Sequence, residues 1–174
     1  MKPIEVATLN GHSIARWVAT EMALSEGPLG EGPILWEHSS VPYLQLISID
    51  LQLEVGSVYR MLSQLDDGNG SGYFGLYLVI RNAIERPCAA KPGSIYRTRE
   101  LSELPVGAAT VAVTETLGPH AVVRMQMDVG GATISFWAAE VDERSGGCFE
   151  VLGPDESILV QVDRMRPAPL TSPP

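Results

Sequence analysis

The most constraining feature of this sequence is a strict alternation of side chains that ends at two glycines. Between residues 121 and 129 every second side chain is apolar, and most of those in between are polar. A period of two indicates a β-strand with one buried face, and Gly130-Gly131 is a typical two-residue hairpin turn. The chain is therefore predicted to reverse at residues 130–131.

The residues after the turn fit the same hairpin. Folding back at the glycines places Met127 opposite Ile134 and Met125 opposite Phe136, and both apolar pairs share one face. On the other face Arg124 comes opposite Trp137, which favours a cation–π contact. The side chains predicted to be buried are Ala121, Val123, Met125, Met127, Ile134, Phe136 and Ala138.

The rest of the chain repeats this pattern more weakly. Short runs rich in apolar and β-branched residues are separated by turns that contain Gly, Pro, Asp and Asn. These features predict an all-β, mainly antiparallel fold, either a sandwich or an irregular barrel. We expect a single domain over residues 1–165, since 174 residues fit one core, and a flexible proline-rich tail over residues 166–174. The predicted strands fall within residues 43–53, 58–65, 73–84, 109–116, 121–129, 132–142, 149–151 and 158–163.

The start of the chain leaves two interpretations open. Asn10-Gly11 predicts a hairpin that would pair Glu5 with Arg16. Ser13 could instead cap one short helix near residues 14–25, with a single apolar face and a stop at Gly27-Pro28.

Negative charge predominates and is unevenly distributed along the chain. The net charge is −9, which disfavours nucleic acid and anionic membranes as partners. Residues 17–59 hold six acids and no Lys or Arg, and residues 140–156 hold six acids against Arg144 alone. Residues 81–99 reverse the balance, with five basic residues against Glu85. If the two acidic segments share a surface, its partner would be a basic protein.

Several motifs match catalytic or ligand-binding patterns only in part. Residues 70–75 read G-x-G-x-x-G but lead into a predicted strand instead of a helix. Residues 67–72 begin like a calcium loop but have Leu78 where the bidentate Glu belongs. Gly11-His12-Ser13-Ile14-Ala15 resembles a nucleophile elbow without its last glycine. We therefore predict no metal, no cofactor and no catalytic residue.

Cysteine usage and the first residues suggest the compartment. Cys88 and Cys148 stand alone, and no apolar signal follows Met1. Reduced thiols in the cytoplasm are the expectation, with buried or unreactive cysteines favoured over redox centres and a Cys88–Cys148 disulfide left open.

The candidate binding residues are the acids of the C-terminal third. Glu140 and Asp142 fall on the same strand face as Ile134, Phe136 and Ala138, so they would continue an apolar face. The favoured function is a non-catalytic interaction module of the inhibitor or immunity type, with an acidic surface for a basic protein. A β-barrel or sandwich that binds a small ligand is the alternative, and a hydrolase that uses Ser13 or the Glu140/Asp142 pair ranks third. The candidate binding residues are Glu140, Asp142, Glu143, Asp155 and Glu156.

Overall fold

A computed structural model describes residues 5–25, 34–65, 72–118, 121–145 and 147–163. Within these residues the regular elements are all strands, apart from one 3₁₀ turn, η1 (Val6–Leu9). The strands are β1 (Ser13–Met22), β2 (Leu44–Leu53), β3 (Val58–Leu65), β4 (Phe74–Arg81), β5 (Tyr96–Glu100), β6 (Gly107–Leu117), β7 (Ala121–Val129), β8 (Ala132–Ala138), β9 (Glu140–Arg144), β10 (Cys148–Leu152) and β11 (Ile158–Asp163).

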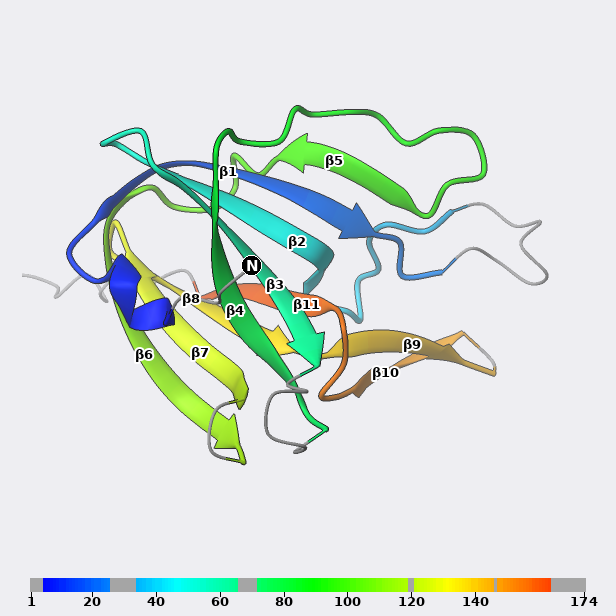
Figure 1. Cartoon of the computed structure of the whole chain (residues 1–174). Helices are drawn as coiled ribbons and strands as arrows, with labels where there is room; N and C mark the ends of the chain where they lie inside the picture. Colours follow the sequence, from blue (N-terminus) through cyan, green and yellow to red (C-terminus); the bar gives the residue numbers. More distant parts are fainter. Residues whose placement is uncertain (1–4, 26–33, 66–71, 119–120, 146, 164–174) are drawn as a thin grey trace, which may run out of the picture.

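Six of these strands close into an antiparallel barrel (Figure 1). The ring runs β1, β2, β11, β8, β7, β6 and returns to β1, while β3 and β4 extend it beyond β2 and β5 extends it beyond β1. The prediction of an all-β antiparallel fold is confirmed, and the ring of strand pairs makes it a barrel. The β9–β10 hairpin forms a separate two-stranded sheet and projects away from the barrel.

Large apolar side chains fill the barrel. Trp17 and Phe136 are almost fully buried, with ring centroids 6.3 Å apart. The Trp17 indole N–H donates to the Pro105 carbonyl at 2.8 Å, so this bulky side chain leaves no unsatisfied donor. All seven side chains predicted to be buried along β7 and β8 are buried.

The β7–β8 hairpin has the predicted register. Met127 pairs with Ile134, Met125 with Phe136 and Arg124 with Trp137. Gly130 and Gly131 both have positive φ, as a tight hairpin turn requires. A Cβ on Gly130 would lie 2.4 Å from the Val106 carbonyl oxygen, so close packing as well as φ demands glycine there.

In the N-terminal segment the helix interpretation is wrong, and the hairpin interpretation is right only about its turn. Residues 13–22 form strand β1 and not a helix, because β1 pairs with β2, β5 and β6, which a helix could not do. The predicted hairpin partner is also wrong, since residues 6–9 form η1 and Arg16 pairs with Gln52. The Asn10-Gly11 turn is real, and Asn10 Oδ1 accepts a 2.5 Å hydrogen bond from the Val111 N–H.

Both cysteines in the described residues, Cys88 and Cys148, are free and exposed, so they form no disulfide with each other and are not buried. Among the described residues, no helix has the length and apolar character needed to cross a membrane.

Candidate interaction surface

Part of the first acidic segment, residues 17–59, is buried within the fold. The Glu21 side chain is only 5% exposed and lies between two arginines of β5. Arg97 donates to Glu21 Oε2, and Arg99 Nε donates to Oε1 at 2.8 Å. Glu21 therefore anchors β5 to β1 and adds little to the surface charge.

Asp50 has an equivalent role on β2. Its carboxylate, 1% exposed, accepts a bidentate pair of hydrogen bonds from Arg60 at 2.7 and 3.0 Å. It also accepts the Glu85 backbone N–H at 2.8 Å. Asp50 thus fastens residues 82–87 to the barrel wall. Of the six acids in residues 17–59, Glu37 and Glu54 are exposed, and Glu26 and Glu31 lie outside the described residues.

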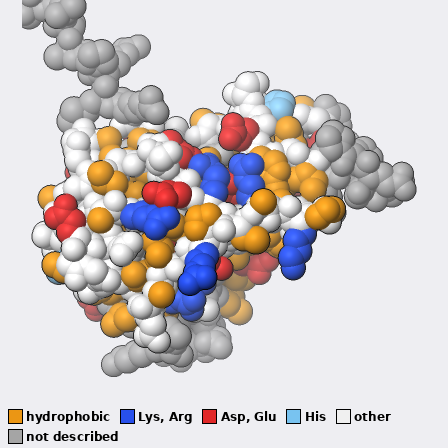
Figure 2. Space-filling view, turned by 90° about the horizontal axis from the view of Figure 1, so that it is seen from above, with side chains coloured by type: hydrophobic (Ala, Val, Ile, Leu, Met, Phe, Trp, Pro, Cys, Tyr) orange, Lys and Arg blue, Asp and Glu red, His pale blue; other side chains and the backbone are white. Residues whose placement is uncertain are grey.

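The arginines of β5 form ion pairs with carboxylates on one side of the molecule. Figure 2 views the side on which β5 lies in Figure 1 and shows basic side chains gathered there with carboxylates beside them. Arg99 bonds Glu103 at 2.6 Å, and Arg97 lies 4.3 Å from the centre of the Trp36 ring. Burial alone would raise the pKa of Glu103, but the hydrogen bonds from Arg99, a backbone hydrogen bond and the charges of Arg99 and Arg97 together lower that pKa. This side is therefore largely neutralised by its own carboxylates.

The second acidic segment keeps its charge at the surface. Alternation along β9 and β10 places Glu140, Asp142 and Glu150 on one face of the hairpin, together with Arg144. Arg144 bonds Asp142 at 3.0 Å and Glu150 at 2.9 Å. A single arginine thus serves two carboxylates, and the face keeps a net negative charge.

Most of the predicted acids come together around Glu140. Burial raises its pKa, and the charges of Asp155, Glu156 and Asp142 raise it further. Four of the five candidate residues are therefore close enough to interact. Glu143 has the other parity on β9 and pairs with Phe149 on the opposite face. Glu140 and Asp142 do lie on the same strand face as Phe136 and Ala138. Beyond Ala138, however, that face no longer points into the barrel core.

Apart from Glu143, the opposite face of the hairpin is apolar. Val141 packs with Leu159 in a second cluster outside the barrel, and Phe149 joins it. The Phe149 ring lies 4.9 Å from the His38 ring. Gln45 holds the base of the hairpin, because its Oε1 accepts the Val141 N–H at 2.6 Å. The β9–β10 hairpin is therefore amphipathic and firmly attached at its base.

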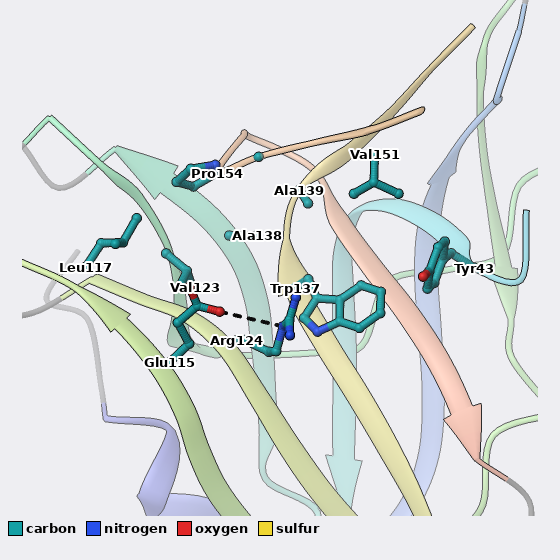
Figure 3. A pocket seen from close by; sticks show the side chains of 11 residues that line it. Tyr43, Glu115, Leu117, Val123, Arg124, Trp137, Ala138, Ala139, Val151 and Pro154 are labelled. Atoms are coloured by element: carbon teal, nitrogen blue, oxygen red, sulfur yellow. Dashed lines mark ion pairs between the residues drawn. The ribbon is translucent and has the colours of Figure 1, made fainter. Parts of the chain in front are cut away.

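A groove of about 370 Å³ runs beside this apolar face (Figure 3). Trp137 lies in its centre, with the Tyr43 ring in an edge-to-face arrangement at a centroid distance of 4.8 Å and the Arg124 guanidinium 4.7 Å from the centre of its ring. The predicted Arg124–Trp137 contact is thus confirmed. Val151, 46% exposed, and Pro154 line the groove from β10 and the following turn.

A second groove, of about 470 Å³, shares the lining residue Tyr43 with the first. Its apolar lining includes Val41, Leu44 and Val160, and its carboxylates are Glu37 and Glu103. No Lys or Arg among the described residues lines it. Sequence reasoning missed both grooves, because Tyr43 and Trp137 are 94 residues apart and nothing local marks them as neighbours.

The described residues show no arrangement that supports the catalytic or metal-binding alternatives. Ser13 begins a strand, whereas a nucleophile elbow leads from a strand into a helix, and no hydrogen bond joins its hydroxyl to a histidine of the described part of the chain. Residues 67–71 of the calcium-like loop lie outside the described residues. Across the described ranges no group of three or more His, Cys, Asp or Glu residues could hold a metal ion.

The described surface therefore offers shape, charge and half-buried aromatic rings, which are the components of molecular recognition. Comparisons with protein-family models, with curated proteins and with solved structures found no match.

Proposed function

We propose that this protein is a non-catalytic interaction module that binds a basic protein through the acidic face of the β9–β10 hairpin and the turn at residues 155–156. The main support is the crowding of carboxylates around Glu140, whose pKa is raised by burial and by Asp155, Glu156 and Asp142. A cation from a partner would relieve this repulsion on binding, so the cluster favours a basic ligand.

The shape of the hairpin also supports the proposal. It projects from the barrel (Figure 1), which gives a partner access to it. Its electrostatic field would speed the approach of a basic surface and would weaken with added salt. Arg97 and Arg99 lie on β5, where they pair with Glu21 of β1, so they do not neutralise the hairpin.

The test is affinity capture with three forms of the full chain as bait. The hairpin variant carries Glu150→Lys and Glu156→Lys, both at exposed positions. The control variant carries Glu5→Lys and Glu54→Lys, which are also exposed and change the net charge equally. We expect a basic protein that the wild type and the control capture at low salt, and that the hairpin variant and high salt both release. Equal capture by both variants would contradict the proposal.

A further inference from the structure

The two grooves that share Tyr43 have a composition that the acidic hairpin does not explain. The first lies outside the barrel core, beside the apolar face of the hairpin, and is lined by Trp137 and Val151. The second is lined by Leu44 and Val160, which pack with the barrel core. Large half-buried aromatic rings outside a core are typical of the centre of a protein interface. The grooves therefore provide apolar contacts where the hairpin provides charge.

The charges that line the grooves are mostly negative. Glu37 and Glu103 line the second groove, and Glu115 lines the first, against Arg124 alone. Glu103 is already paired with Arg99, but Glu37 is exposed and forms no ion pair with any described residue. An occupant that carries Lys or Arg beside apolar side chains would complement this lining.

One polar atom beside the first groove lacks a partner. The Trp137 indole N–H is covered by its surroundings and finds no acceptor among the described residues. Arg124 lies over the ring, is half exposed and reaches Glu115 only at 3.8 Å, so it can move aside at little cost. With Arg124 displaced, a peptide carbonyl that approaches in the plane of the indole ring would supply the missing acceptor.

From these observations we infer that the two grooves bind an extended segment of the basic partner protein. Its apolar side chains would pack against Trp137 and Val151, and a Lys or Arg would lie near Glu37. This inference rests on the proposed function and adds to it the site and the chemistry of the segment that is bound.

The test uses three synthetic peptides of equal length, with blocked ends, and the full chain labelled with ¹⁵N. The first peptide alternates Lys with Val and Tyr, the second alternates Lys with Ser, and the third alternates Glu with Val and Tyr. The readout is the indole N–H signal of Trp137, assigned by its loss in Trp137→Phe. The Trp17 indole is an internal control, since it is buried and already bonded to Pro105.

We expect the first peptide to move the Trp137 signal and to bind more tightly than the other two. Val151→Ser, at an exposed position, should weaken this binding about fivefold through lost apolar contact. Val106→Ser is the matched control, because Val106 is similarly exposed and lines neither groove.

Two failures are distinguishable. If the Lys/Ser peptide binds as tightly as the first and Val151→Ser has no effect, charge alone attracts the partner, and the groove inference is wrong while the proposed function stands. If the Glu peptide binds as well as the Lys peptides, the preference for a basic partner is itself wrong.

Discussion

At the scale of single residues, Gly130 offers the most direct test of the fold. A methyl group there would meet the Val106 carbonyl oxygen at 2.4 Å, and φ is +56°. Gly131 has φ of +86° but open space around it. We expect Gly130→Ala to lower the free energy of unfolding by at least about 2 kcal/mol, and Gly131→Ala by about 1 kcal/mol. Urea denaturation measures both, and equal losses would mean that the contact with Val106 is absent.

Asp50 gives a second prediction at the same scale. Asp50→Ala would leave the Arg60 guanidinium, 16% exposed, without its bidentate partner and would free the Glu85 N–H. Breaking such a pair costs about 3 kcal/mol of unfolding free energy. The double variant Asp50→Ala/Arg60→Met should recover part of this loss, because it removes a largely buried guanidinium that would be left with only the half-exposed Glu85 carboxylate among the described residues. Thermal and urea denaturation of both variants provide the check, and a double variant less stable than Asp50→Ala would contradict the account.

At the scale of elements, the β9–β10 hairpin makes stability depend on pH through Glu140. Its pKa in the folded protein is raised above the ordinary 4.5, so the folded state holds this proton more tightly than the unfolded state. The associated stabilisation is present at low pH and is lost as the pH rises through the folded-state pKa. We expect Glu140→Gln to raise the melting temperature at neutral pH and to leave it unchanged below pH 4.5.

Glu143→Gln is the control for that experiment, since it removes one charge from an exposed site on the same strand. Melting curves of both variants across the acid range measure the difference. A Glu140→Gln variant that is less stable than the wild type at neutral pH would show that the carboxylate is stabilised and not crowded. The amphipathic hairpin thus retains repulsion that a basic partner could relieve.

At the scale of the whole molecule, the barrel core should suffice for stability without covalent or metal links. A chain of this size buries roughly 70% of the surface that its unfolded form exposes. Both thiols are free and exposed, so Cys88→Ser/Cys148→Ser should change the free energy of unfolding by less than about 0.5 kcal/mol for each site. Reductant and chelator should also leave the melting temperature of the wild type unchanged. A drop of several degrees with either reagent would overturn this expectation.

The sequence by itself determined those features that depend on neighbouring residues. The alternation from Ala121 to Val129 and the two glycines after it specify strand, turn and register. A one-residue slip would turn the apolar side chains of one strand to the other face, and the length of the turn fixes which residues pair. The Arg124–Trp137 contact follows from that register, and so does the parity that places Glu140 and Asp142 on one face.

Only the tertiary structure decided what depends on contacts between distant parts of the chain. Residues 13–22 suited both a helix and a strand, and pairing with β2 and β5 selected the strand. Acids that looked alike in the sequence were separated by their surroundings: Glu21 and Asp50 are buried against arginines, whereas Glu140 meets Asp155 and Glu156. The grooves at Tyr43 and Trp137 arise where strands far apart in sequence become neighbours. Local patterning sets which way a side chain points along a strand, but closure of the barrel sets which other side chains it meets.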